Sequence, residues 1–148
     1  MKQSNASLIG SAIKRSKGEN IVEFAIIAPL LLLITFGIIQ GFFIFGNWLI
    51  ITNEARENAR YGAISSGDPA RDPTLIADVV NRVQQRTTGI LDQTQLTPTA
   101  IRGTGQFTVQ ISYNVDMFIS PLIPGLPNQV TLRAASTMRT EDASAGGS

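Results

Sequence analysis

A single carboxylate stands in an otherwise uncharged stretch near the start of this sequence. Glu23 is the fifth residue after Gly18, and the next charged residue is Glu54. A charge in a membrane helix costs about 2.5–3.5 kcal/mol at the bilayer centre unless it is paired or reaches the interface. The chemistry open to Glu23 is therefore ion pairing in lipid. The alternative is that its side chain simply extends to the cytoplasmic headgroups.

The other residue types offer little for catalysis. The chain contains no His and no Cys, which removes the usual general base, most transition-metal sites and the Ser-His and Cys-His nucleophile arrangements. The acids of the C-terminal part include Asp78, Asp92 and Asp116, on unrelated elements. We expect no catalytic residue, metal or cofactor. An exported enzyme with a membrane anchor is therefore the least favoured interpretation of this chain.

The apolar run from Phe24 to about Ile51 is long enough to cross a membrane. A bilayer core about 30 Å thick needs roughly 20 apolar residues in a helix, so this helix should continue beyond the lipid. A cleaved secretory signal would have an apolar core of about 7–15 residues and end in small residues, and this run does neither. We therefore predict a span that the mature protein retains.

Basic residues before the span predict its direction. No acid occurs among the first eighteen residues, whereas acids and bases are mixed just after the span. Because Lys and Arg concentrate on the cytoplasmic side, we predict a cytoplasmic N-terminus and an exported C-terminal part. The basic residues of the leader are Lys2, Lys14, Arg15 and Lys17. There is no other basic patch and the net charge is +1, so we expect no nucleic-acid partner.

The order of these features is similar to that of a known family. A basic leader, Gly18, Glu23 and a long apolar helix together resemble the class III signal peptide of the type IV pilin superfamily. Pro29 and the run EARENARY at 54–61 narrow the resemblance to a TadE-like pseudopilin or minor pilin of the tight-adherence (Flp, type IVb) pilus system, and the proline-rich segment 121–127 is also similar. The major Flp pilins are much shorter and carry tyrosine after the glutamate, where this chain has Phe24, which favours a minor pilin or pseudopilin.

This resemblance implies processing and assembly. A membrane prepilin peptidase would cut between Gly18 and Glu19, on the cytoplasmic face. Glu23 would then pair with the new N-terminal amine of its own chain or of the next subunit, although Glu19 places a second acid beside that amine.

The implied partners are the membrane, the prepilin peptidase, other pilins or pseudopilins and the tight-adherence secretion machinery. The implied location is the bacterial inner membrane, with a periplasmic or extracellular C-terminal domain and incorporation in the pilus as a further option. The alternative is an uncleaved single-pass scaffold with an exported interaction domain, in which Gly18 is accidental.

Five further residues of the long helix are candidates for packing or contact. Pro29 should kink or loosen the helix because it cannot donate a backbone hydrogen bond, or it is simply a tolerated membrane proline. Gly37 and Gly41 form a G-x-x-x-G pair that allows close helix packing, but this pattern also arises by chance. Arg56 and Arg60 lie four residues apart and are candidate subunit contacts, or contacts to the head, unless they belong to a solvated extension.

The remainder of the chain predicts a small head. We expect Gly62 and the turn residues 65–69 to end the long helix, and Asp72 and Pro73 to begin an amphipathic helix that runs to about Arg86. Apolar and polar residues alternate in 107–115 and 130–138, which predicts two strands, and 96–101 is a weaker edge strand.

The predicted fold class is α+β and pilin-like. A long N-terminal transmembrane helix, from about Asn20 to Tyr61, extends into a head in which one amphipathic helix packs on an antiparallel sheet of about three strands. The outer half of the long helix should contribute to the core of the head.

The predicted boundaries are a basic leader at 1–18, whose first ten residues are disordered or weakly helical, the transmembrane and extended helix at 19–62, the head at 63–140 and a disordered tail at 141–148. Segment 121–127 is predicted as a loop whose exposed Leu122, Ile123 and Leu126 form a contact surface.

Overall fold

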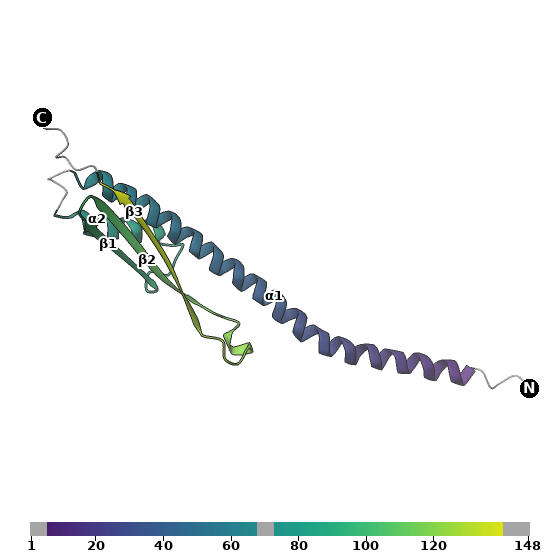
Figure 1. Ribbon diagram of the computed structural model, residues 1–148. Helices are drawn as coiled ribbons and strands as arrows, with labels where there is room; N and C mark the ends of the chain where they lie inside the picture. Colours follow the sequence, from purple (N-terminus) through teal and green to yellow (C-terminus); the bar gives the residue numbers. More distant parts are fainter. Residues whose placement is uncertain (1–5, 68–72, 141–148) are drawn as a thin grey trace, which may run out of the picture. The chain divides into compact units, whose positions relative to one another are not determined.

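The computed structural model describes residues 6–67 and 73–140 and confirms the α+β class. Two helices precede a three-stranded antiparallel sheet (Figure 1). In chain order the elements are α1 (Ala6–Ser65), α2 (Leu75–Thr87), β1 (Leu96–Gly103), β2 (Gln106–Asp116), the short 3-10 helix η1 (Ser120–Leu122) and β3 (Gln129–Arg139). The chain divides into two compact units, one up to Gln40 and one from Gly41 onward, and α1 contributes to both.

Helix α1 is longer at both ends than predicted. It begins at Ala6 rather than near Asn20, and it ends at Ser65 rather than Tyr61. The helix continues through Pro29. Proline has no backbone N–H, so one hydrogen bond of the helix is missing at this position. The stretch Asn20–Ser65 is long and apolar enough to cross a membrane by length and composition.

Gly62 does not end the helix, and that expectation was wrong. α1 continues for a further turn to Ser65, and the ring of Phe107 lies in the space that a Cβ atom on Gly62 would occupy. The glycine is thus a packing position, where the missing side chain admits an aromatic ring from β2. Sequence patterns alone do not distinguish these two uses of glycine.

Helix α2 is amphipathic as predicted but begins later. Its N-cap is Thr74, which makes no side-chain capping bond, and Pro73 lies in the preceding turn. Asp72, the predicted cap, lies outside the described residues. The buried residues Leu75, Val79, Val83 and Thr87 recur at helical spacing and form one face.

The sheet has the order β1-β2-β3, with β2 in the centre. Its register pairs Leu96 with Tyr113 and Phe107 with Met138. The predicted alternation on β2 is confirmed: the odd-numbered residues Phe107, Val109, Ile111, Tyr113 and Val115 are buried. They face a core that includes four residues of α1, namely Ile51, Ala55, Ala59 and Ala63, which confirms that the outer half of the long helix belongs to the head.

Candidate assembly surface on the long helix

The predicted processing and pairing residues both lie on α1. Gly18 and Glu23 are exposed, and a Cβ atom on Gly18 would meet nothing within 4 Å. Glu23 is five positions after Gly18, a rise of about 7.5 Å along the helix axis at about 1.5 Å per residue. No side chain that the structure describes forms an ion pair with Glu23. Its carboxylate is thus directed to the surroundings of the helix.

The surface of α1 that follows Glu23 is apolar and exposed. Phe24 and Ile26 are each 71% exposed, and the large apolar residues other than Ile44 remain exposed as far as Leu49, although to a smaller extent. An apolar surface of this extent marks contact with a membrane or with other proteins. Gly37 and Gly41 lie on this stretch, and a Cβ atom on either would meet nothing within 4 Å, so both remain open to a neighbouring helix.

The two arginines of the helix extension are exposed. Neither Arg56 nor Arg60 forms an ion pair with a residue that the structure describes. In the described part of the protein, no ion pair supports the alternative that they bind the head of their own chain, and contact with a partner subunit stays a prediction.

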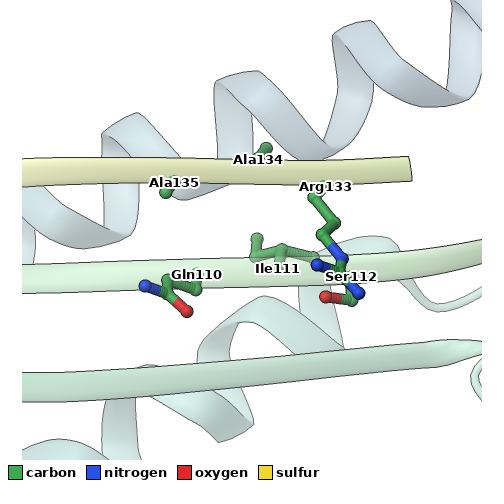
Figure 2. A pocket seen from close by; sticks show the side chains of 6 residues that line it. All are labelled: Gln110, Ile111, Ser112, Arg133, Ala134 and Ala135. Atoms are coloured by element: carbon green, nitrogen blue, oxygen red, sulfur yellow. The ribbon is translucent and has the colours of Figure 1, made fainter. Parts of the chain in front are cut away.

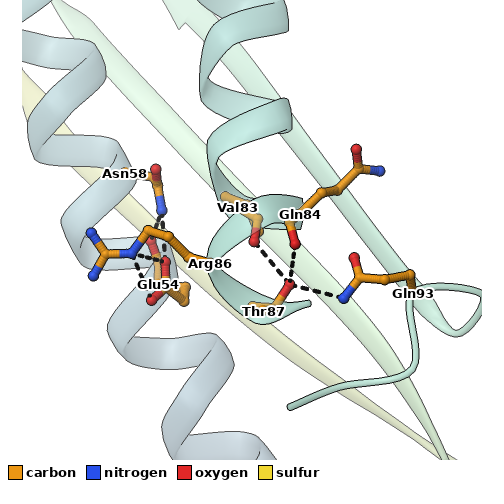
Figure 3. Close-up of polar contacts among 7 residues, drawn as sticks. All are labelled: Glu54, Asn58, Val83, Gln84, Arg86, Thr87 and Gln93. Carbon is orange, nitrogen blue, oxygen red and sulfur yellow. Dashed lines mark hydrogen bonds and ion pairs between the residues drawn. The ribbon is translucent and has the colours of Figure 1, made fainter. Parts of the chain in front are cut away.

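A different pair joins the helix to the head. Arg86 of α2 donates from Nε to Glu54 of α1, 3.2 Å from each carboxylate oxygen (Figure 3). The Glu54 side chain is only 14% exposed, and its Oε2 also accepts a hydrogen bond from Nδ2 of Asn58 at 3.1 Å. Next to this pair, the guanidinium carbon of Arg82 lies 4.6 Å from the ring centroid of Tyr61. Sequence reasoning missed both contacts because they join segments that are distant along the chain.

A second polar group closes the C-terminal end of α2. The Thr87 hydroxyl donates to the Val83 carbonyl at 2.8 Å and accepts from Nε2 of Gln93 at 3.2 Å (Figure 3). Asp92 lies just before Gln93, and its Oδ1 accepts from the Thr94 hydroxyl at 2.7 Å and from the Thr94 backbone N–H at 2.9 Å. These two bonds, the hydroxyl bond first, lower the pKa of Asp92. This group fixes a turn and holds no reactive nucleophile.

The outer face of the sheet carries a shallow depression. Its volume is about 320 Å³, and Figure 2 shows Gln110 and Ser112 of β2 beside Arg133 and Ala135 of β3. Arg133 is the one titratable residue in its lining. Among the described residues there is no group of three potential metal ligands. The depression therefore offers polar contacts rather than an acid–base pair or a metal site.

A comparison with known protein families finds a match over α1. The family model described as TadE-like protein matches residues 21–60, which confirms the predicted resemblance over α1. No curated protein and no solved structure matches the chain. The match includes Glu23, Pro29, Gly37, Gly41, Arg56 and Arg60, whereas Gly18 and segment 121–127 lie outside it. The match shows similarity to the TadE-like family over α1, and the same helix has the length and composition to cross a membrane once.

Proposed function

We propose that this chain is a pseudopilin or minor pilin of a tight-adherence pilus. It is inserted in the bacterial inner membrane with its N-terminus in the cytoplasm, processed after Gly18 by prepilin peptidase, and used in pilus assembly. Its partners are the peptidase, other pilins or pseudopilins and the secretion machinery. Its role is structural, and no step of it requires catalysis by this chain.

One observation carries the proposal. The TadE-like match at residues 21–60 includes the exposed apolar surface of α1 and contains Glu23, the one acid next to that surface before Glu54. A lone carboxylate on such a surface needs a cation or access to the interface. Cleavage after Gly18 would supply the cation, because it creates a new amine about one helical turn away.

The same reasoning assigns a role to the exposed helix surface. In the membrane it contacts lipid, and in an assembled pilus the neighbouring helices replace that lipid. Gly37 and Gly41 are the positions where a neighbouring backbone approaches most closely, because both are open on the isolated chain. Pairing of Glu23 with the next subunit's amine would set the axial position of that neighbour.

Mass and N-terminal sequence of the protein from membranes of cells with and without the prepilin peptidase test this function. We expect a chain that starts at Glu19 only when the peptidase is present. Gly18→Val should block cleavage, whereas the matched change Gly10→Ala in the same leader should leave it intact. A chain that keeps the leader in both strains would overturn the processing step.

An uncleaved scaffold is the second candidate, and one observation favours it. α1 is helical without interruption from Ala6 through Gly18, so the leader and the span form one element. In this alternative the leader remains on the mature protein as a cytoplasmic extension. The same experiment separates the two candidates, since the scaffold keeps its full length in every strain.

A further inference from the structure

The loop between β2 and β3 is an uncharged surface of the head that exposes large apolar side chains. No charged residue occurs between Asp116 and Arg133. Phe118 and Leu122 are 48% and 57% exposed in this loop, and Leu122 ends the short helix η1. Two large apolar side chains on an uncharged loop call for a partner that is itself apolar.

Part of the backbone of this loop is hydrogen-bonded within the loop itself. Five of its N–H groups donate to carbonyls within the loop, namely those of Met117, Ser120, Leu122, Ile123 and Leu126. Pro121, Pro124 and Pro127 have no N–H to satisfy. The Ser120 hydroxyl adds bonds to the Leu126 carbonyl at 3.0 Å and to Oδ1 of Asn128 at 2.7 Å. Each donor that is paired within the loop lowers the cost of removing water from around it.

The partner of this loop can be inferred from where the loop lies along α1, within the unit from Gly41 onward. Phe107 lies against Gly62, and from there β2 runs beside the part of α1 that belongs to this unit, toward the end that begins at Gly41 (Figure 1). From Phe107 to Val115 the strand covers about 27 Å. From Gly62 back to Ile44 the helix also covers about 27 Å. Were the strand parallel to the helix axis, the loop after Val115 would begin at the level of Ile44, and Ile44 does pack against the core of the head.

The helix at this level is still apolar and exposed on its other sides. Phe42 and Phe45 are 73% and 56% exposed, and Trp48 and Leu49 are each more than 40% exposed. The exposed apolar surface of α1 thus overlaps the head by several residues. If that surface lies in lipid, the end of the head beside it must lie at the lipid surface as well.

We propose that the loop 117–128 is a membrane-contact wedge, which enters the headgroup region on the exported side with Phe118 and Leu122 in contact with lipid. Interfacial segments of this kind lie about 5–10 Å into the headgroup and acyl boundary. The wedge ends at Asp116, whose Oδ1 accepts from Nε2 of Gln129 at 2.7 Å across the base of the loop. The inference rests on the proposed membrane span of α1.

The absence of cysteine makes a direct test simple. The full chain, with single cysteines at chosen positions, is labelled with an environment-sensitive fluorophore and reconstituted at low density in vesicles of phosphatidylethanolamine and phosphatidylglycerol. Leu122→Cys reports on the loop, and Pro124→Cys is a second reporter should the first disturb it. Phe42→Cys reports on the helix, and Thr104→Cys, in the turn at the opposite end of β2, is the water control. Quenching by lipid-borne nitroxide is compared with quenching by iodide.

We expect the labels at positions 122 and 42 to be quenched by the lipid-borne nitroxide and the label at position 104 by iodide. Iodide quenching at position 122 equal to that at 104, with position 42 still in lipid, would overturn the wedge and leave the proposed function standing. Protection of position 122 from both quenchers would indicate a second copy of the chain as the occupant and would also overturn the wedge. A label at position 42 that is open to iodide would remove the membrane span and the wedge together.

Discussion

The ring of Phe107 lies directly on Gly62, in the space where any other residue would place its Cβ atom. Both residues are buried, and Phe107 is the largest fully buried side chain of the described protein. The central strand of the sheet can approach the helix here because α1 presents Gly62 among the small residues Ala55, Ala59 and Ala63. This contact fixes the end of β2 that is remote from the proposed membrane wedge.

Gly62→Ala should therefore destabilise the head. Because the new Cβ atom would overlap the Phe107 ring, the cost should lie in the upper part of the overpacking range of about 1–3 kcal/mol. Replacing a helical glycine gains up to about 1 kcal/mol, so we expect a net loss of about 1–2 kcal/mol. Denaturant unfolding of the full chain in mild detergent measures this change in the free energy of unfolding. Gly46→Ala is the matched control, because a Cβ atom there meets nothing within 4 Å.

The double variant Gly62→Ala with Phe107→Leu should regain part of that loss, since the smaller side chain leaves room for the new methyl group. An unchanged stability for Gly62→Ala alone would show that the ring can move aside at no cost.

The Glu54–Arg86 pair should contribute to the packing of α2 on α1. A double-mutant cycle with Glu54→Gln and Arg86→Met is expected to give a coupling energy of about 0.5–1 kcal/mol, the upper range for pairs that are partly open to solvent. High salt should reduce it, because the Debye length falls to about 3 Å at 1 M. Arg56→Gln, at an exposed position without an ion pair to any described residue, should change stability by no more than about 0.5 kcal/mol. A coupling energy of zero at low salt would contradict this assignment.

Glu23→Ala should permit insertion but prevent incorporation into the pilus. Removing the carboxylate leaves the apolar helix easier to insert, while the new amine loses its partner. Membrane fractionation measures insertion, and pilus yield measures incorporation. Glu23→Asp retains the charge and should restore part of the yield. A normal pilus yield with Glu23→Ala would contradict the pairing mechanism. It would not contradict processing after Gly18.

Asp92 should titrate below its ordinary pKa of 3.8. The folded state stabilises the carboxylate through the Thr94 hydroxyl and then the Thr94 backbone N–H, so it binds the proton less tightly than the unfolded chain does. The resulting contribution to stability is complete above the unfolded pKa and is lost as the pH falls through the folded pKa. Carboxyl-resolved NMR titration measures this value. Thr94→Val removes the hydroxyl and should raise the Asp92 pKa part of the way back, and an unchanged pKa would exclude that bond as the main cause.

Much of this fold could be predicted because its signals are local. The apolar run after Glu23, the alternation on β2 and the helical spacing of Leu75, Val79 and Val83 each repeat with the period of one element, and those elements are confirmed. The boundaries were less accurate. Pro73 and Gly62 are both common at helix ends, yet here Pro73 lies just before the N-cap of α2 and Gly62 lies within α1.

The contacts between elements could not be predicted in the same way. Glu54 and Arg86 are separated by 32 residues, and nothing in either local sequence indicates the other. The Phe107–Gly62 contact depends on the register of β2 against α1, which only packing determines. The processing and pairing roles of Gly18, Glu19 and Glu23 come from resemblance, and they stay predictions because they concern a peptidase and neighbouring subunits.

The four core residues of α1 have a practical consequence for the preparation of a soluble head. A fragment that begins after the helix, at Gly67 for example, would lack Ile51, Ala55, Ala59 and Ala63 and would leave α2 and the inner face of the sheet open to water. It should aggregate during expression. A fragment that begins at Gly41 keeps that layer, and replacing the exposed Phe42, Phe43 and Phe45 with polar residues would be the first step toward a sample that needs no detergent.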